Sequence, residues 1–166
     1  MAKQPTQKKI DKWQRWFAIE CNNLAWELAA KFDRTPDEDR RMLLGAYAAA
    51  FHWSNVGQPV NDARADLALA HVHSLLGQQM ALQYAQRCLA FFENNAGEDW
   101  DLAFAHAEMA HAAAVIGDKN LHAKHYATAK ELGSAIQNDE DRNIFMEEFL
   151  RIPDQVHTGR ALRRNT

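Results

Sequence analysis

Two nine-residue segments that lie 40 residues apart align without a gap, and each ends at a glycine. The segments are LAHVHSLLG, which ends at Gly77, and MAHAAAVIG, which ends at Gly117. The alignment pairs His71 with His111, each six residues before its glycine. Helical units that recur at a fixed interval bury their apolar faces on one another, so the chain is constrained to stack similar units side by side.

The sequence predicts α-helices along the whole chain. Proline and glycine are sparse and mostly lie at the ends of the predicted helices or between them, and no segment alternates β-branched and polar residues as a strand would. Thr35 followed by Pro36 and Glu38 forms a capping-box pattern, and Asp118 and Asn138 are further candidate N-caps. The predicted helices span about 7–32, 36–57, 60–76, 79–94 and 99–116, with a sixth that starts at 118 and a seventh at about 139–151.

The repeat resembles the tetratricopeptide family over about residues 62–135. Ala70 and Ala110 occupy the small-residue position of the first helix of that family, and Tyr126 and Ala129 match an aromatic and a small position of the second. The interval of 40 residues exceeds the family's repeat of about 34. The resemblance implies an all-α, right-handed array of antiparallel helix hairpins. We expect a single domain over 11–152, between flexible basic tails at 1–10 and 153–166.

Two further helices have expected places in such an array. The segment LLGAYAAAF of the second helix is apolar or small on every side, so we expect that helix to be central. The last helix carries Ile144, Phe145 and Phe149 on one side and charged residues elsewhere. It therefore suits a terminal cap.

The register of the repeat selects one set of candidate binding residues. In the tetratricopeptide family the position of His71 and His111 faces a concave groove, and the same stripe adds Arg64, Ser74 and Phe104. If this holds, the two histidines lie side by side and contact one ligand, and they would attract acidic groups as the pH falls through about 6.5. The alternative is that both histidines pack between helices with satisfied ring nitrogens.

A second candidate region lies in the first two helices. Trp26, Glu27, His52 and Trp53 could converge between helices as a small-molecule pocket. The alternative is a structural network, because a buried indole N–H needs an acceptor such as a carboxylate.

Local histidine spacing argues against a metal. His106 and His111 lie five residues apart, which separates them by about 140° around a helix, so they do not chelate as an i, i+4 pair does. His122 and His125 share a face with Asp118, but Asp118 is better explained as an N-cap. The sequence therefore predicts no metal and no other cofactor.

Charge and composition exclude several classes of protein. The formal net charge is −3, but the two basic ends leave −9 on residues 13–150, and such a body repels nucleic acid. Neither a secretory leader nor an apolar run of eighteen residues occurs, so we expect a cytoplasmic protein without a membrane segment. Cys21 and Cys88 form no CxxC motif, which gives no support for a cysteine zinc site.

The sequence contains no motif that is characteristic of a particular enzymatic reaction. The chain lacks a P-loop, a GxGxxG loop and a GxSxG elbow, although Glu20, Glu27 or Glu108 could act near a histidine if the fold brought them together. We therefore expect a non-catalytic module that binds a protein segment or peptide. The alternative is a helical protein, such as an enzyme, that binds a small molecule or a metal through interior His, Glu and Trp residues.

Overall fold

The computed structural model describes residues 4–154 and 156, and in that part of the chain it contains seven α-helices and no strand. The all-α prediction is confirmed, and the helix boundaries differ from the predicted ones by only a few residues. The helices are α1 (Gln7–Ala29), α2 (Pro36–Val56), α3 (Pro59–Leu75), α4 (Met80–Phe92), α5 (Asp99–Ile116), α6 (Lys119–Ser134) and α7 (Asp139–Phe149).

The predicted caps account for these boundaries. The Thr35 hydroxyl accepts from the Glu38 backbone N–H while the Glu38 carboxylate accepts from the Thr35 N–H, which completes the capping box. Asp118 caps α6. Gly77 and Gly117 adopt φ values of +66° and +79°, the left-handed conformation that favours glycine after a helix. The two glycines that end the repeated segments are thus explained by the left-handed backbone conformation at these helix ends.

The expected tails overlap with the fold at the N-terminus. Helix α1 begins at Gln7, so residues 7–10 are helical and do not belong to a tail. At the other end, Ile152 is buried and the His122 ring contacts the Pro153 carbonyl oxygen at 2.7 Å. Of the expected tails, residues 1–3, 155 and 157–166 lie outside the described part of the chain.

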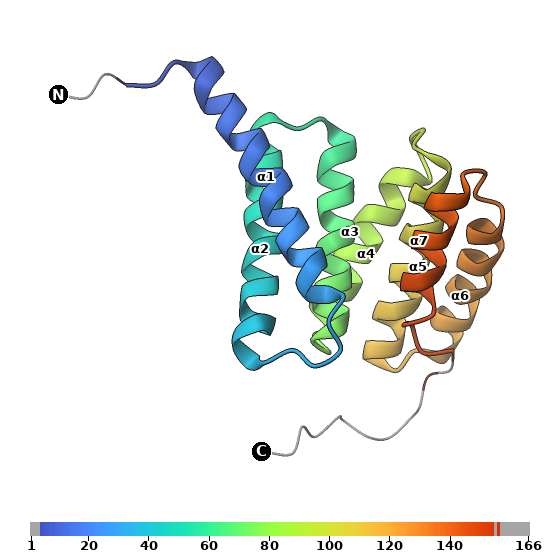
Figure 1. The fold of residues 1–166 in the computed structure, drawn as a ribbon. Helices are drawn as coiled ribbons and strands as arrows, with labels where there is room; N and C mark the ends of the chain where they lie inside the picture. The colour runs from blue at the N-terminus through green and yellow to red at the C-terminus, as the bar shows by residue number, and fades with distance from the viewer. Residues whose placement is uncertain (1–3, 155, 157–166) are drawn as a thin grey trace.

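The helices pack in the order in which they occur in the chain (Figure 1). Each helix from α1 to α6 contacts the next one, and α7 packs on both α5 and α6. The odd-numbered helices also contact one another, α1 with α3, α3 with α5, and α5 with α7. In the described part of the chain, the backbones of α2, α4 and α6 lie farther apart, and α2 meets α4 through the Tyr47 and Tyr84 side chains, whose hydroxyl oxygens are 3.4 Å apart. The odd-numbered helices are therefore the closer-packed layer.

The core consists of three apolar clusters, each shared by three helices. One lies between α1, α2 and α3, the next between α3, α4 and α5, and the third between α5, α6 and α7. Helices α3 and α5 each contribute to two clusters and bury an unbroken run of residues, 65–74 and 105–113. These two helices, and not α2, are central.

The expectation for α2 was wrong because α2 lies at one edge of the array, where it packs on α1 and α3 and reaches α4 through the Tyr47–Tyr84 contact. Leu44 and Phe51 on its outer side are 56% and 64% exposed, whereas the Tyr47 hydroxyl contacts His73 of α3 at 2.9 Å. The expectation for α7 holds in part. Phe145 and Phe149 are buried on α5 and α6, whereas Ile144 is 51% exposed.

Helix α7 fits on α6 only because residue 133 has no side chain. A β-carbon at Gly133 would overlap the ring of Phe145, which is fully buried. We predict that Gly133→Ala lowers the free energy of unfolding by about 1–3 kcal/mol through overpacking, although alanine is the better helix former. Urea unfolding checks this. Lys130→Ala, an exposed position on the same helix, is the matched control and should change stability by less than about 0.5 kcal/mol.

Candidate functional site

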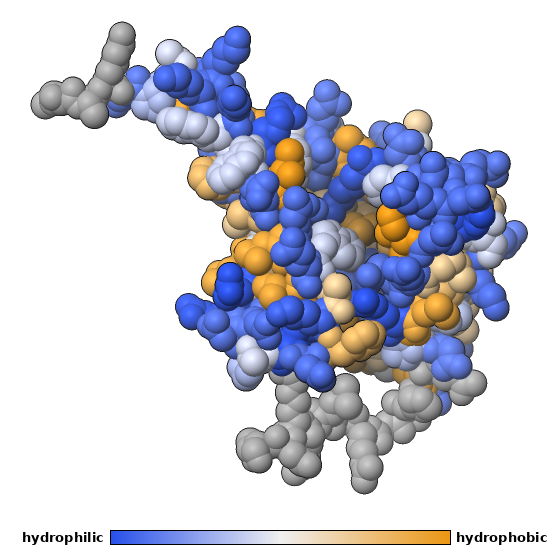
Figure 2. Space-filling view, viewed as in Figure 1, coloured by the Kyte–Doolittle hydropathy of each residue, from blue (hydrophilic) through white to orange (hydrophobic). Residues whose placement is uncertain are grey.

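A cavity of about 390 Å³ opens on the face that carries α1 and α7. In Figure 2 hydrophobic side chains are visible between these two helices. All of the lining residues come from the odd-numbered helices, two from each. They are Asn22 and Trp26 of α1, Arg64 and Leu67 of α3, Trp100 and Phe104 of α5, and Ile144 and Glu148 of α7.

One wall of this pocket is held by a partly buried ion pair. The Arg64 guanidinium donates two hydrogen bonds to the Asp101 carboxylate, at 2.9 and 2.8 Å, and Asp101 is 1% exposed. Arg64 also lies over the Trp100 ring at 4.5 Å. A bidentate pair with a stacked ring fixes the guanidinium, so Arg64 shapes the wall but has little free charge to offer a ligand.

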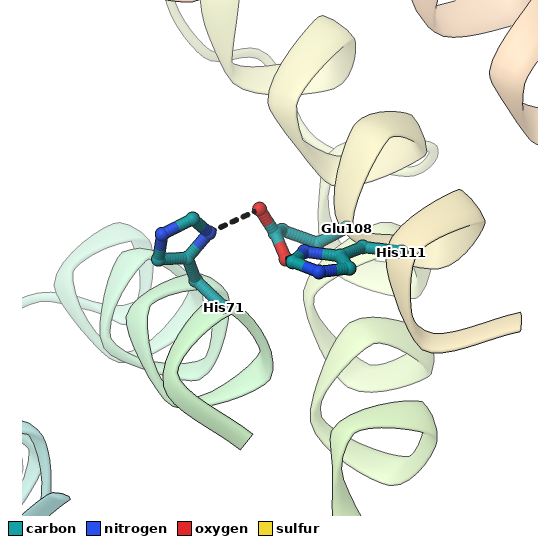
Figure 3. A group of neighbouring side chains, drawn as sticks. All are labelled: His71, Glu108 and His111. Atoms are coloured by element: carbon teal, nitrogen blue, oxygen red, sulfur yellow. Dashed lines mark hydrogen bonds and ion pairs between the residues drawn. The ribbon is translucent and has the colours of Figure 1, made fainter. Parts of the chain in front are cut away.

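Three ionisable side chains converge beneath the pocket, in the interface between α3 and α5 (Figure 3). His71 Nδ1 donates to Glu108 Oε1 at 2.8 Å, and His111 Nδ1 lies 3.6 Å from Glu108 Oε2. The rings of His71 and His111 have centroids 5.9 Å apart. All three residues are buried, with exposures of 2%, 2% and 6% for His71, Glu108 and His111.

Trp26 and Glu148 connect this cluster to the pocket. The Trp26 ring stacks on His71 with centroids 4.7 Å apart. Glu148 Oε2 lies 3.8 Å from His71 Nε2 and 3.7 Å from Arg151 Nε. Both Trp26 and Glu148 also line the pocket. Trp26 and Glu148 therefore form the floor of the pocket, and the buried His71 ring lies directly beneath them.

Burial and charge act in opposite directions on the central pair. Burial alone would lower the pKa of His71, but the Glu108 carboxylate, and Glu148 more weakly, raise this pKa above its usual value. Burial alone would raise the pKa of Glu108. The nearby His71 and His111 nevertheless hold the pKa of Glu108 below its usual range. In the absence of any other cation, His71 and Glu108 thus form a buried imidazolium–carboxylate pair.

The repeat register predicted part of this site. Its prediction that His71 and His111 lie side by side is confirmed by the ring geometry. The two rings are buried below the pocket and do not line an open groove. Arg64 and Phe104 of the same stripe do line the pocket, whereas Ser74 is buried with its hydroxyl oxygen unpaired.

The second predicted region does not assemble as one site. Trp26 faces the pocket, but Glu27 is exposed and is not among the pocket residues. His52 contacts Gln14 through its Nδ1 and stacks on Phe17, with ring centroids 5.4 Å apart. Trp53 is partly buried and does not line the pocket either. The expected convergence fails because α1 and α2 run antiparallel (Figure 1), so His52 near the end of α2 lies beside Gln14 and Phe17 of α1 and away from Trp26.

Sequence reasoning left several site residues unassigned. Asp101, Trp100 and Glu148 were not singled out, and Glu108 was only one of three possible bases. A signal for Glu108 exists. It is the only charged residue in the stretch LAFAHAEMAHAAAVIG, and a lone carboxylate on a helix without a polar face requires an internal partner. No comparable signal marks Glu148, which lies on an otherwise charged helix.

The other histidines form a separate structural group. His106 and His125 are buried and face each other with their Nδ1 atoms 2.8 Å apart, while His122 contacts a carbonyl oxygen. His122 and His125 therefore have different partners, and with Asp118 capping α6 they form no Asp-His-His cluster. The His106–His125 hydrogen bond needs one proton between the two facing nitrogens, so the pair is stable only when it is not fully protonated.

This pair predicts a loss of stability in acid. Burial, and then the nearby His106, lower the pKa of His125 to about 4, and burial also lowers the pKa of His106. The unfolded chain therefore takes up protons from about pH 6.5 downwards while the folded pair does not, and stability falls between about pH 6.5 and 4. We expect His125→Gln to reduce this loss by about 1–2 kcal/mol. Urea unfolding at pH 7.5 and 4.5 measures it, and an unchanged difference between the two pH values would contradict the assignment.

Comparisons with protein-family models, with curated proteins and with solved structures find no match to this chain. None of the helices in the described residues is long and apolar enough to cross a membrane. The site must therefore be interpreted from its own geometry.

Proposed function

We propose that this chain is a non-catalytic, tetratricopeptide-like binding module whose pocket receives an apolar side chain from a protein segment or peptide. The observation that carries the proposal is the origin of the lining residues, two from each of α1, α3, α5 and α7. The odd-numbered helices pack more closely on one another than the even-numbered ones do, which favours an array curved around the pocket face. A segment that crosses such a face can contact several helices at once.

The chemistry of the pocket favours an apolar anchor. Trp26, Leu67, Trp100, Phe104 and Ile144 supply most of its wall. Aromatic and aliphatic anchors that fill pockets of this kind dominate the energetics of most protein interfaces. A volume of about 390 Å³ is enough for one large side chain.

The surrounding charge favours a basic partner, and this proposal therefore differs from the acidic ligand expected from the repeat register. Arg64 is neutralised by Asp101, and the charge that His71 gains is paired with Glu108. Neither residue leaves free positive charge for a ligand. Glu148 lines the pocket and residues 13–150 carry −9, so basic residues beside the anchor would be attracted.

A pair of exposed aliphatic residues tests the proposal. Ile144 is 51% exposed and lines the pocket, whereas Leu44 is 56% exposed on the outer side of α2. Peptides would be selected from a random display library on the full chain, and their affinities measured by fluorescence anisotropy. We expect enriched peptides to share one large apolar residue. Ile144→Lys should weaken them about 10- to 100-fold, because it removes apolar contact and repels a basic segment, while Leu44→Lys should change affinity less than about 2-fold.

Two outcomes of this selection would count against the module. One is that no peptide family is enriched, and the other is that Leu44→Lys weakens binding as much as Ile144→Lys does. Selection of small apolar molecules but not peptides, in a parallel fragment screen, would favour the alternative of a small-molecule site. Circular dichroism of both variants ensures that a loss of affinity does not reflect unfolding.

A further inference from the structure

The cluster beneath the pocket contains more donor atoms than its hydrogen bonds use. Among the described residues, four buried atoms here lack a hydrogen-bond partner: His71 Nε2, Glu108 Oε2, His111 Nδ1 and Glu148 Oε2. An unpaired buried polar group costs about 1–3 kcal/mol, so native structures rarely keep several together. Four such atoms on neighbouring side chains indicate a missing partner that accepts lone pairs.

Proton placement in the His71 ring leads to the same conclusion. With its Nδ1 proton donated to Glu108, the His71 imidazolium points its Nε2 proton towards the Glu148 carboxylate, but the 3.8 Å between the two atoms is too long for a hydrogen bond. Nε2 and the Glu148 oxygen are therefore left without a hydrogen-bond partner in this arrangement. If Nδ1 binds a metal ion instead, the proton resides on Nε2 and can be donated to Glu148. A histidine ligand whose far nitrogen donates to a carboxylate is the usual arrangement at protein metal sites.

We propose that His71, Glu108 and His111 bind one divalent transition-metal ion, for which Zn²⁺ is the best-fitting candidate, and that Glu148 orients His71 by accepting its Nε2 proton. One ligand atom from each of the three residues lies within 4.8 Å of the other two. Tetrahedral zinc ligands at about 2.0–2.1 Å from the ion lie roughly 3.3 Å apart, so side-chain rotation alone can close the site. A fourth coordination position is left for water or another ligand.

Charge and access are consistent with such an ion. Glu108 and Glu148 bring two carboxylates into a region of low exposure, and a dication would balance them with both imidazoles neutral. Figure 3 shows the His71 and His111 rings on two sides of the Glu108 carboxylate, His71 on α3 and the other two residues on α5. Since Glu148 lines the pocket, an ion can reach His71 from that side.

This inference replaces the expectation that the chain binds no metal. That expectation rested on spacing within single helices, where the one histidine pair on a common face, His122 and His125, was set aside because Asp118 beside it is an N-cap. The three donors come from two helices that the 40-residue register places next to each other. The inference does not depend on the proposed peptide binding, because the ion uses residues below the pocket.

Titration of the full chain with zinc tests the site. Protein stripped with a chelator would be titrated with ZnCl₂ by calorimetry, and we expect one equivalent to bind. His71→Gln and His111→Gln should each weaken binding at least about 100-fold, and Glu148→Gln about 10-fold without a change in stoichiometry. His106→Gln is the matched control, a buried histidine on α5 that contacts another histidine, and it should have no effect. Ile144→Lys should leave zinc binding intact while it blocks peptides.

A second readout keeps the test decisive if a variant fails to fold. In the wild-type chain, nitrogen-15 NMR of the imidazoles should show coordination shifts at the Nδ1 atoms of His71 and His111 alone. The inference is overturned if zinc binds more weakly than about 10 μM, or if the shifts appear on other histidines.

Discussion

The structure depends on two central helices that have almost no polar face. Helices α3 and α5 bury unbroken runs of residues, and their many alanines let the helix axes approach closely. Every polar group on these helices must then find its partner inside the protein. Arg64 with Asp101, and His71 with Glu108, are the results of this constraint, and both pairs join α3 to α5.

These two pairs also divide the site into layers. The Arg64–Asp101 pair braces the wall of the pocket, and the His71–Glu108 pair lies below the floor, covered by Trp26 and Glu148. The upper layer is apolar and open to one face, which suits a side chain of a partner. The lower layer is polar and enclosed, which suits an ion. Binding in one layer can influence the other through Glu148, the residue that both layers share.

The sequence predicted the fold more completely than the site. Helix ends follow from local chemistry, such as the Thr35–Glu38 capping box and the glycine at position 117 that adopts a positive φ, and the sequence predicts both. The 40-residue register placed His71 beside His111, because equivalent positions on stacked units are neighbours. The register did not identify Glu108 or Glu148 as site residues, because neither carboxylate has an equivalent in the repeat. The central position expected for α2 was wrong, because an apolar helix can also lie at an edge with Leu44 and Phe51 exposed.

The central claim is that the enclosed layer holds an ion between α3 and α5. Crystals grown with zinc and measured on both sides of the zinc absorption edge test it most directly. The account predicts one strong anomalous peak about 2 Å from the Nδ1 atoms of His71 and His111 and from a Glu108 oxygen, with Glu148 turned towards His71 Nε2. A structure with zinc in the crystallisation medium, no peak at this position and an intact His71–Glu108 hydrogen bond would contradict it.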